Sequence, residues 1–370
     1  MNTVFPPRDI IQRFCDNSEK MKITPLGQGN INDTFLLRCC KTFLVLQGIN
    51  KTVFPDPRIL INNLAHLSRH LELQSNSSER RWVDAVLIPA TDGSTAVTDT
   101  TGKLWRALSY IQDSITFPHA ETNSLAEQTG WALGHFHRRV ANLATDALLP
   151  PLPGFHVLSS YLRKYQQLST RISVHDTATI QWCKKVIAEE QGAALILEQA
   201  LESRKIHRSI IHGDPKIANV LFDSKSHLAL SIIDLDTVGP GLLLHDIGDC
   251  LRSVCNNCDE AGKLERVSFN LDRCNAALHG YFQAAGQLLS LVEKELLYDA
   301  VKSITFELGL RFFTDYLQGC IYFKCNSPEE TLHKAMIQFS LLKDINAKKG
   351  PIKKLILQTS RKLEKNSHRE

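Results

Sequence analysis

Hydrophobic and polar positions follow two different spacings along the chain. In about the first third, short apolar runs are separated by turns containing Gly, Asp or Asn, which is typical of antiparallel strands. Apolar residues that recur at three- and four-residue steps predict two helices in the same part. The expected strands are 22–26, 33–39, 43–47, 84–88, 95–97 and 103–111, and the expected helices are 6–15 and 57–73.

Beyond residue 112 the spacing is helical over most of the chain. The expected helices are 125–140, 157–168, 177–202, 262–285, 292–318 and 327–346. Between 209 and 234, short apolar runs instead enclose a polar loop. The length of 370 residues favours more than one compact unit. The pattern predicts an α+β fold.

The polar loop carries side chains whose order and spacing suit phosphoryl transfer. Asp214 precedes Asn219 by five residues, and Asp234 follows directly after the apolar run 228–233. Phosphoryl transfer depends mainly on positioning and charge neutralisation. Asp214 is expected to accept the proton of a hydroxyl group, Asn219 and Asp234 to bind Mg²⁺ through oxygen, and Lys216 to contact the γ-phosphate. The alternative interpretation is that these polar residues only shape a turn.

The signature of these residues resembles a known superfamily. His212-Gly213-Asp214, followed by Asn219 and later by Asp234, is similar to the motif of the aminoglycoside phosphotransferase and choline kinase superfamily. The protein-kinase pattern has Arg at the position of Gly213. The resemblance implies a two-lobed protein-kinase-like fold that binds ATP and Mg²⁺ in the cleft and phosphorylates a small-molecule hydroxyl. In this chain the sheet-containing lobe would span 1–111, with a hinge at about 109–114. The larger helical lobe would span 112–346, and a basic tail would follow over 347–370.

The first lobe is expected to bind the nucleotide. Gly27 and Gly29 lie in a loop where glycines let backbone N–H groups approach phosphate oxygens, although a plain hairpin turn is the alternative. Gln47 stands where kinase-like folds place a phosphate-binding lysine, which would also suit an inactive pseudokinase. The expected nucleotide-binding residues are Gly27, Gly29, Asn30, Asn32 and Gln47, with Ser109 and Ile111 at the hinge.

Two segments also resemble one branch of the superfamily, the N-acetylhexosamine 1-kinases. Residues 26–35 and 43–57 are similar to its first lobe, and residues 306–324 are similar to its sugar-binding end. The resemblance implies that Arg311 and Tyr322 contact the sugar. The alternative is that Arg311 pairs internally with Asp315 and that Tyr322 fills the core.

The chain departs from that branch at two further positions. Gly48 and Cys320 stand where the branch has an Arg and an Asp. We therefore expect an ATP- and Mg²⁺-dependent enzyme that phosphorylates a sugar hydroxyl, above all the anomeric hydroxyl of an N-acetylhexosamine. The alternatives are a kinase for choline, an amino alcohol or an aminoglycoside, and a pseudokinase.

Charge and apolar content exclude other classes of function. Lys and Arg number 43 against 39 Asp and Glu, which leaves a net charge of +4 and no dense basic stripe. Nucleic-acid binding is therefore not expected. The sequence also has no apolar run of membrane-spanning length and no N-terminal secretory pattern, so a cytoplasmic location is expected. Nothing in the sequence indicates the oligomeric state.

The ten cysteines are expected to be free thiols, because a long chain of this kind belongs in a reducing compartment. The Cys255-Asn-Asn-Cys258 pair suggests a zinc site. A second pair at suitable spacing is missing, so structural zinc is not favoured.

Overall fold

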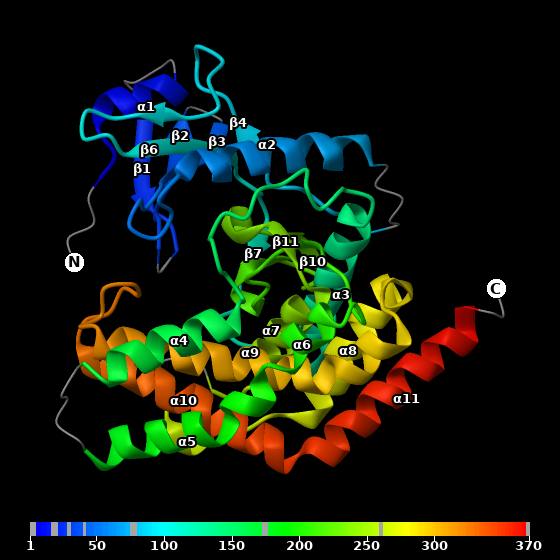
Figure 1. Cartoon of the computed structure of the whole chain (residues 1–370). Coiled ribbons are helices and arrows are strands. Elements are labelled where there is room, and N and C mark those ends of the chain that lie inside the picture. Colours follow the sequence, from blue (N-terminus) through cyan, green and yellow to red (C-terminus); the bar gives the residue numbers. More distant parts are fainter. Residues whose placement is uncertain are drawn as a thin grey trace.

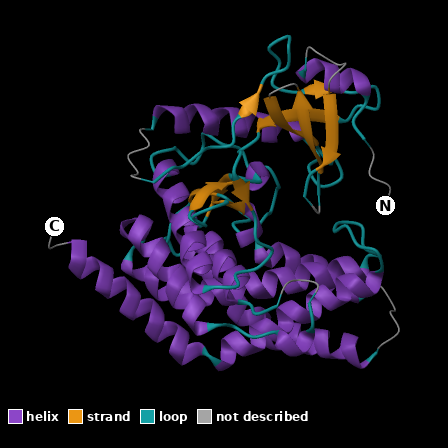
Figure 2. Ribbon diagram, turned by 180° about the vertical axis from the view of Figure 1, so that it is seen from behind, coloured by secondary structure: helices purple, strands orange, loops and turns teal. Residues whose placement is uncertain are grey.

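The computed structural model describes residues 5–15, 21–27, 31–39, 42–74, 80–171, 177–258 and 262–367. A small lobe built around an antiparallel sheet lies over a larger, mostly helical lobe (Figure 1). The change of secondary structure between the lobes is plain in Figure 2, where the larger sheet lies at one end of the molecule. The predicted α+β, two-lobed fold is confirmed. The proposed boundary at 109–114 stays a prediction.

The sheet of the first lobe has the order β1-β2-β3-β6-β4, with β5 paired to β6. One face buries apolar side chains from alternate positions, such as Phe35, Leu46 and Trp105. Helix α1 (Arg8–Phe14) covers this face through Ile10 and Phe14. The strands are β1 (Met21–Pro25), β2 (Asp33–Cys39), β3 (Thr42–Gly48), β4 (Leu87–Ile88), β5 (Val97–Thr98) and β6 (Leu104–Ser109).

Helix α2 (Pro57–Leu73) connects the two lobes. It begins where Asp56 accepts a hydrogen bond from the Arg58 N–H at 3.2 Å, and Pro57 suits the first helical turn. Its residues Leu64, Leu67 and Leu71 belong to the main core of the larger lobe. The helix therefore packs against both lobes, since its Leu60 lies in a buried group with Ile49 of the first lobe.

The larger lobe is built around the crossing of α3 (Asn123–Val140) and α8 (Leu271–Ala285). Gly130 and Gly280 allow this crossing, since a Cβ on either would lie 2.0 Å from a carbonyl oxygen of the other helix. The remaining helices are α4 (Leu158–Ser169), α5 (Ala178–Ala194), α6 (Ile196–Glu202), α7 (Leu243–Cys255), α9 (Leu291–Leu317), α10 (Pro328–Ala347) and α11 (Lys349–Ser367).

Several expected elements differ in extent. The helix predicted over 177–202 is two helices, because the backbone leaves helical geometry at Leu195 (φ −81°, ψ 3°). The helix predicted from 262 begins at Leu271, where Asn270 caps its first turn. The basic tail is helix α11, and its Ile352 and Ile356 are buried in the main core.

The cysteine prediction is wrong at one pair. Cys15, after α1, and Cys39, at the end of β2, are joined by a disulfide with their Cα atoms 6.2 Å apart. Both are buried on the apolar face of the sheet, where packing brings two distant segments together. Seven other described cysteines form no disulfide. Among the described helices, none has an apolar stretch long enough to cross a bilayer.

Candidate active site

The polar loop lies between short strands at the top of the larger lobe. Strand β8 (Ser209–Ile211) leads into it, and the 3₁₀ helix η2 (Ile217–Asn219) leads out into β9 (Val220–Asp223). β9 pairs with β10 (Ala229–Ile232) and with β7 (Ser114–Ile115), and β8 pairs with β11 (Gly239–Gly241). In Figure 1 these short strands lie between the first lobe and the helices below.

Asp246 braces the loop from α7. Its fully buried carboxylate accepts the backbone N–H of His212 at 2.6 Å and that of Gly213 at 2.8 Å. The ring of His137 contacts the same carboxylate at 2.9 Å. Burial alone would raise the pKa of Asp246, but these hydrogen bonds and the neighbouring histidines lower it. Asp246 is therefore a structural brace of the polar loop.

Gly213 is required by a close approach of two loops. Its φ is +89°, and a Cβ would lie 2.8–2.9 Å from atoms of Thr237. The Thr237 hydroxyl donates to the His212 carbonyl at 2.8 Å. A side chain at position 213 would therefore push the polar loop away from the segment that carries Asp234.

Asp214, Lys216 and Asn219 are in mutual contact. The Asp214 carboxylate lies 2.7 Å from Lys216 Nζ and accepts from the Asn219 amide at 3.0 Å. The same amide nitrogen donates to the Asp214 carbonyl at 2.8 Å. Burial raises the pKa of Asp214, but Lys216 and His212 bring it below its usual value. An ionised carboxylate at this place is suited to accept a proton.

Asp234 is brought beside Asn219 by strand pairing. Ile232 pairs with Val220, and the Ile233 N–H donates to the Asn219 carbonyl at 2.8 Å. Asp234 itself has left-handed backbone geometry, with φ of 64°. Part of its side chain reaches solvent. Its pKa is nevertheless raised to about 7, because it loses solvation in the cleft and faces the carboxylates of Asp236 and Asp214.

These residues fit a magnesium ion. The Asn219 amide nitrogen is engaged, so its oxygen is the atom available to a cation. Carboxylate and amide oxygens are ligands that Mg²⁺ accepts. Repulsion from the carboxylates of Asp236 and Asp214 helps to raise the pKa of Asp234, and a bound cation would relieve this repulsion.

The structure describes three of the five nucleotide-binding residues predicted in the first lobe, namely Gly27, Asn32 and Gln47. Gly27 has a positive φ of +71°, and Gly29 and Asn30 lie outside the described residues. Asn32 points toward the larger lobe, where its amide donates to Asp236 at 2.5 Å. Its role in binding phosphate stays a prediction.

The hinge residues already have protein partners. The Ser109 N–H donates to the Val86 carbonyl at 2.9 Å, and the Ile111 carbonyl accepts from the Ser114 hydroxyl at 2.6 Å. Neither of these groups faces outward for an adenine edge. The roles of Ser109 and Ile111 in adenine binding stay predictions.

Gln47 has a partner that sequence reasoning missed. Its side-chain oxygen accepts from Arg106 at 2.8 and 3.1 Å. Arg106 also pairs with the carboxylate of Asp236. The sequence signal was a charged residue between Trp105 and Ala107 in an otherwise apolar strand.

The departure at Gly48 has a packing reason. A Cβ at this position would lie 2.6 Å from Lys103 Cε and 2.9 Å from the Trp105 ring. Trp105 is itself buried, and its indole N–H donates to Asp99 at 2.8 Å. The space that an arginine would need here is therefore filled by β6.

Arg311 and Tyr322 come together at the far end of α9. The Tyr322 hydroxyl accepts from Arg311 at 3.3 Å. The Arg311 guanidinium lies 5.3–5.6 Å from the centres of four aromatic rings, those of Phe155, Tyr161, Tyr322 and Phe323. This group of Arg311 and four rings is called the arginine box below.

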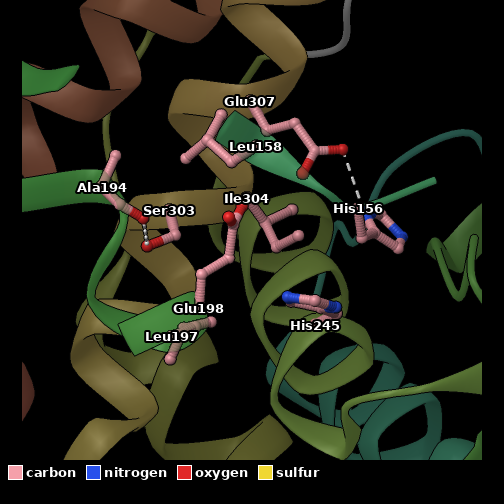
Figure 3. A pocket seen from close by; sticks show the side chains of 9 residues that line it. All are labelled: His156, Leu158, Ala194, Leu197, Glu198, His245, Ser303, Ile304 and Glu307. Atoms are coloured by element: carbon pink, nitrogen blue, oxygen red, sulfur yellow. Dashed lines mark hydrogen bonds and ion pairs between the residues drawn. The ribbon is translucent and has the colours of Figure 1, made fainter. Parts of the chain in front are cut away.

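A buried polar chain links the arginine box to the polar loop. Glu307 lies 3.8 Å from Arg311 and 3.0 Å from His156 Nδ1. The other ring nitrogen of His156 contacts the Gly213 carbonyl at 3.1 Å. Figure 3 shows the His156–Glu307 contact at one side of a small cavity. That cavity, of about 10 Å³, has room for one water and none for an acceptor.

The alternative pairing of Arg311 with Asp315 is wrong. Both Asp315 carboxylate oxygens accept backbone N–H groups of residues 321–323, at 2.8–3.0 Å. Asp315 thereby orders the loop that carries Tyr322, and Arg311 pairs with Glu307 on the preceding turn. Tyr322 also packs against a buried group of the first lobe, which includes Ile49 and Phe54. The arginine box therefore lies beneath the first lobe.

Comparison with known proteins agrees with this geometry. The profile of the phosphotransferase enzyme family, APH, matches residues 22–284. A structure described as microcompartment-associated aminopropanol kinase has a TM-score of 0.64 at 15% identity, covering 93% of this chain and 97% of that one. An aminoglycoside phosphotransferase from Alicyclobacillus acidocaldarius has a TM-score of 0.59 at 12% identity, covering 98% of each chain.

A third solved structure extends the same likeness. The choline kinase from Cryptosporidium parvum has a TM-score of 0.55 at 12% identity, covering 95% of this chain and 92% of that one. At these identities the likeness concerns the fold. It spans both lobes, so the whole two-lobed arrangement is shared.

Proposed function

The chain belongs to the phosphotransferase enzyme family, and we propose that it transfers the γ-phosphate of ATP to a hydroxyl of a neutral sugar, most specifically the anomeric hydroxyl of an N-acetylhexosamine. Asp214 would accept the hydroxyl proton, because its lowered pKa keeps the carboxylate ionised and therefore able to accept. Lys216, 2.7 Å from Asp214, would balance charge as the phosphoryl group moves. Asn219 and Asp234 would hold Mg²⁺, which when bound neutralises phosphate charge.

The observation that carries the choice of acceptor is the arginine box. Aromatic cages in other proteins recognise cationic ligands such as choline through the faces of their rings. Here the rings surround the side chain of Arg311, which is charged at all physiological pH values. A choline, an amino alcohol or a protonated aminoglycoside would meet a positive charge where it needs a negative or aromatic surface.

A neutral N-acetylated sugar suits the same group of residues. Arg311 has N–H donors for hydroxyl or acetamide oxygens, and Tyr322 offers a hydroxyl and a ring face. The chain through Glu307 and His156 to the Gly213 carbonyl would hold this binding surface in register with Asp214. The solved structures named above include kinases for cationic acceptors, and the arginine box is the feature that argues for a different acceptor here.

The experiment is ADP release with Mg-ATP across an acceptor panel. The panel contains N-acetylglucosamine, N-acetylgalactosamine, glucose, galactose, choline, aminopropanol and kanamycin, and phosphorus NMR locates the new ester. We expect turnover with the N-acetylhexosamines and a 1-phosphate product. Turnover confined to the cationic acceptors would contradict the proposal, and ATP binding without turnover on any acceptor would favour a pseudokinase.

Variants at Arg311 separate the acceptor claim from the reaction itself. Arg311→Gln should raise KM for the sugar by about tenfold or more, because a charged hydrogen-bond donor is lost. Arg163→Gln, an exposed arginine on α4, is the matched control and should leave KM unchanged. An unaltered KM in Arg311→Gln would remove the arginine box from acceptor binding.

A further inference from the structure

The cation that kinase-like folds place on the third strand has a candidate replacement on the neighbouring strand. Gln47 on β3 and Arg106 on β6 are direct partners in the antiparallel pairing. Both side chains lie on the sheet face opposite the apolar core that contains Leu46 and Trp105. The guanidinium group therefore reaches the place of the missing lysine from one strand away.

The guanidinium is held firmly on two sides. Gln47 Oε1 accepts from Arg106 Nε at 3.1 Å and from Nη2 at 2.8 Å. Nη2 also pairs with the Asp236 carboxylate, and Arg106 is only 1% exposed. Gln47 is positioned in turn by the Thr34 hydroxyl, to which it donates at 3.3 Å. These contacts fix the plane of the guanidinium.

One nitrogen of this fixed group is left over. Arg106 Nη1 is buried and has no hydrogen-bond partner among the described residues. A buried N–H of a charged group that makes no hydrogen bond is costly, so such an atom points to a ligand. The missing ligand would be an acceptor, and an anionic one is favoured by the charge.

The surroundings indicate which anion would reach it. Asp236 stands two residues after Asp234, the candidate magnesium ligand. Asp236 also accepts from Asn32, at the end of the glycine-containing loop, at 2.5 Å. Arg106 and Asn32 therefore meet at Asp236, beside the segment that is expected to hold the metal ion of the phosphates.

We propose that Arg106 is a nucleotide-binding residue that contacts the phosphates of ATP in place of the lysine absent from β3. Gln47 is then a positioning residue that aims the guanidinium. Asp236 balances the charge of Arg106 when no nucleotide is bound. When nucleotide binds, Arg106 interacts with the phosphates as well as with Asp236. The inference rests on the proposed function only in requiring ATP as the phosphate donor.

The test is nucleotide binding by calorimetry, with Mg²⁺ and without an acceptor. ATP, ADP, AMP and adenosine are titrated into the full-length wild type, Arg106→Gln and the double variant Gln47→Lys/Arg106→Gln. The double variant moves the cation back to β3 across the same strand pair. Arg13→Gln, which removes an exposed arginine of the first lobe, is the control.

The expected result depends on the number of phosphates. Arg106→Gln should weaken ATP and ADP by about tenfold or more while adenosine changes little, since charge-assisted hydrogen bonds are lost. The double variant should recover most of the ATP affinity. Equal weakening of ATP and adenosine, or unchanged ATP affinity, would overturn the proposal and leave Arg106 as a structural ion pair between the lobes.

A conservative variant keeps the test decisive if Arg106→Gln does not fold. Arg106→Lys retains a cation against Asp236, but its single ammonium group cannot serve Gln47, Asp236 and a phosphate together. It should melt close to the wild type and still lose affinity for ATP relative to adenosine. If the wild type binds ATP and adenosine equally tightly, this inference is refuted even if a sugar is phosphorylated. If its affinity rises clearly with the number of phosphates, the inference is supported even if no sugar is phosphorylated.

Discussion

At the scale of single residues, charged side chains of the candidate site form close pairs of opposite charge. Lys216 pairs with Asp214, Arg106 with Asp236 and Arg311 with Glu307. Breaking a buried pair by removing one partner leaves the other charge uncompensated, which is strongly destabilising. Conservative substitutions are therefore the informative ones in this site.

His135 gives a prediction for pH dependence. Its ring stacks on Trp131 at 4.8 Å between centres, and its Nδ1 contacts Arg138 at 3.2 Å, which requires a neutral acceptor nitrogen. Burial, followed by the nearby arginines, lowers the pKa of His135 to about 4. The unfolded chain takes up a proton near pH 6.5. This contribution to stability is therefore present above pH 6.5 and is lost as pH falls toward 4.

The measurement is the free energy of unfolding in urea at pH 7 and pH 5. His135→Phe keeps the stacking and cannot titrate. The wild type should lose on the order of 1–2 kcal/mol more than the variant between these two pH values. An identical loss in both proteins would show that His135 does not remain neutral in the folded state.

Sequence reasoning correctly predicted that three polar residues of this region lie close together. Asp214, Asn219 and Asp234 meet because the strands on either side of them pair, and short-range spacing is enough to anticipate that. Arg106 and Glu307 were missed because their partners lie far away in the sequence. The alternative pairing of Arg311 with Asp315 is wrong. Helical spacing allowed Arg311 a partner on either neighbouring turn, and Asp315 instead accepts hydrogen bonds from the backbone of 321–323.

At the scale of elements, the larger lobe depends on the crossing of α3 and α8. Gly280→Ala would place a methyl group 2.0 Å from the Glu127 carbonyl oxygen. The helices would have to separate, so we expect a loss of about 2 kcal/mol or more in the free energy of unfolding.

The chain offers a matched control on α5. Gly192 is an exposed helical glycine with open space around its Cα. Gly192→Ala should therefore stabilise the protein by about 0.5–1 kcal/mol through helix propensity. Chemical denaturation of both variants measures the two effects. A stable Gly280→Ala protein would mean that the crossing tolerates a wider spacing.

Elements with strong local signals were predicted closely, and those defined by their partners were not. Helix α2 has its expected ends because Asp56 and Pro57 mark its start and its apolar spacing is regular. Strands β7 and β11 were missed, since they have two and three residues and exist only through pairing with β9 and β8. The break at Leu195 has no marked local signal, as no Pro or Gly stands there.

At the scale of the whole molecule, the two lobes are joined by polar contacts around the cleft. Arg106 and Asn32 reach from the first lobe to Asp236. The Asn63 amide on α2 donates to the carbonyl of Leu149 at 2.7 Å. Lys324 of the larger lobe lies 3.6 Å from Asp33 of the first lobe. The two lobes are therefore in direct contact at several separate places.

The global fold was predictable because its parts follow one another in order along the chain. A sheet with two helices precedes a helical region, and that sequence of elements is the two-lobed arrangement seen in Figure 1. The role of α2 as a shared helix was not predictable, since its leucines could pack equally well behind the first sheet. The contacts with α3 and the strands of the larger lobe decide that question.

The central claim is that Asp214 is the base of a phosphoryl transfer reaction. The most direct test compares Asp214→Asn with the wild type, using Mg-ATP and the acceptor that the wild type phosphorylates fastest. Asp146→Asn, an exposed carboxylate outside the cleft, is the control. We predict that Asp214→Asn binds ATP about as tightly as the wild type and loses about 100-fold or more in kcat. Unchanged turnover in Asp214→Asn would contradict the account.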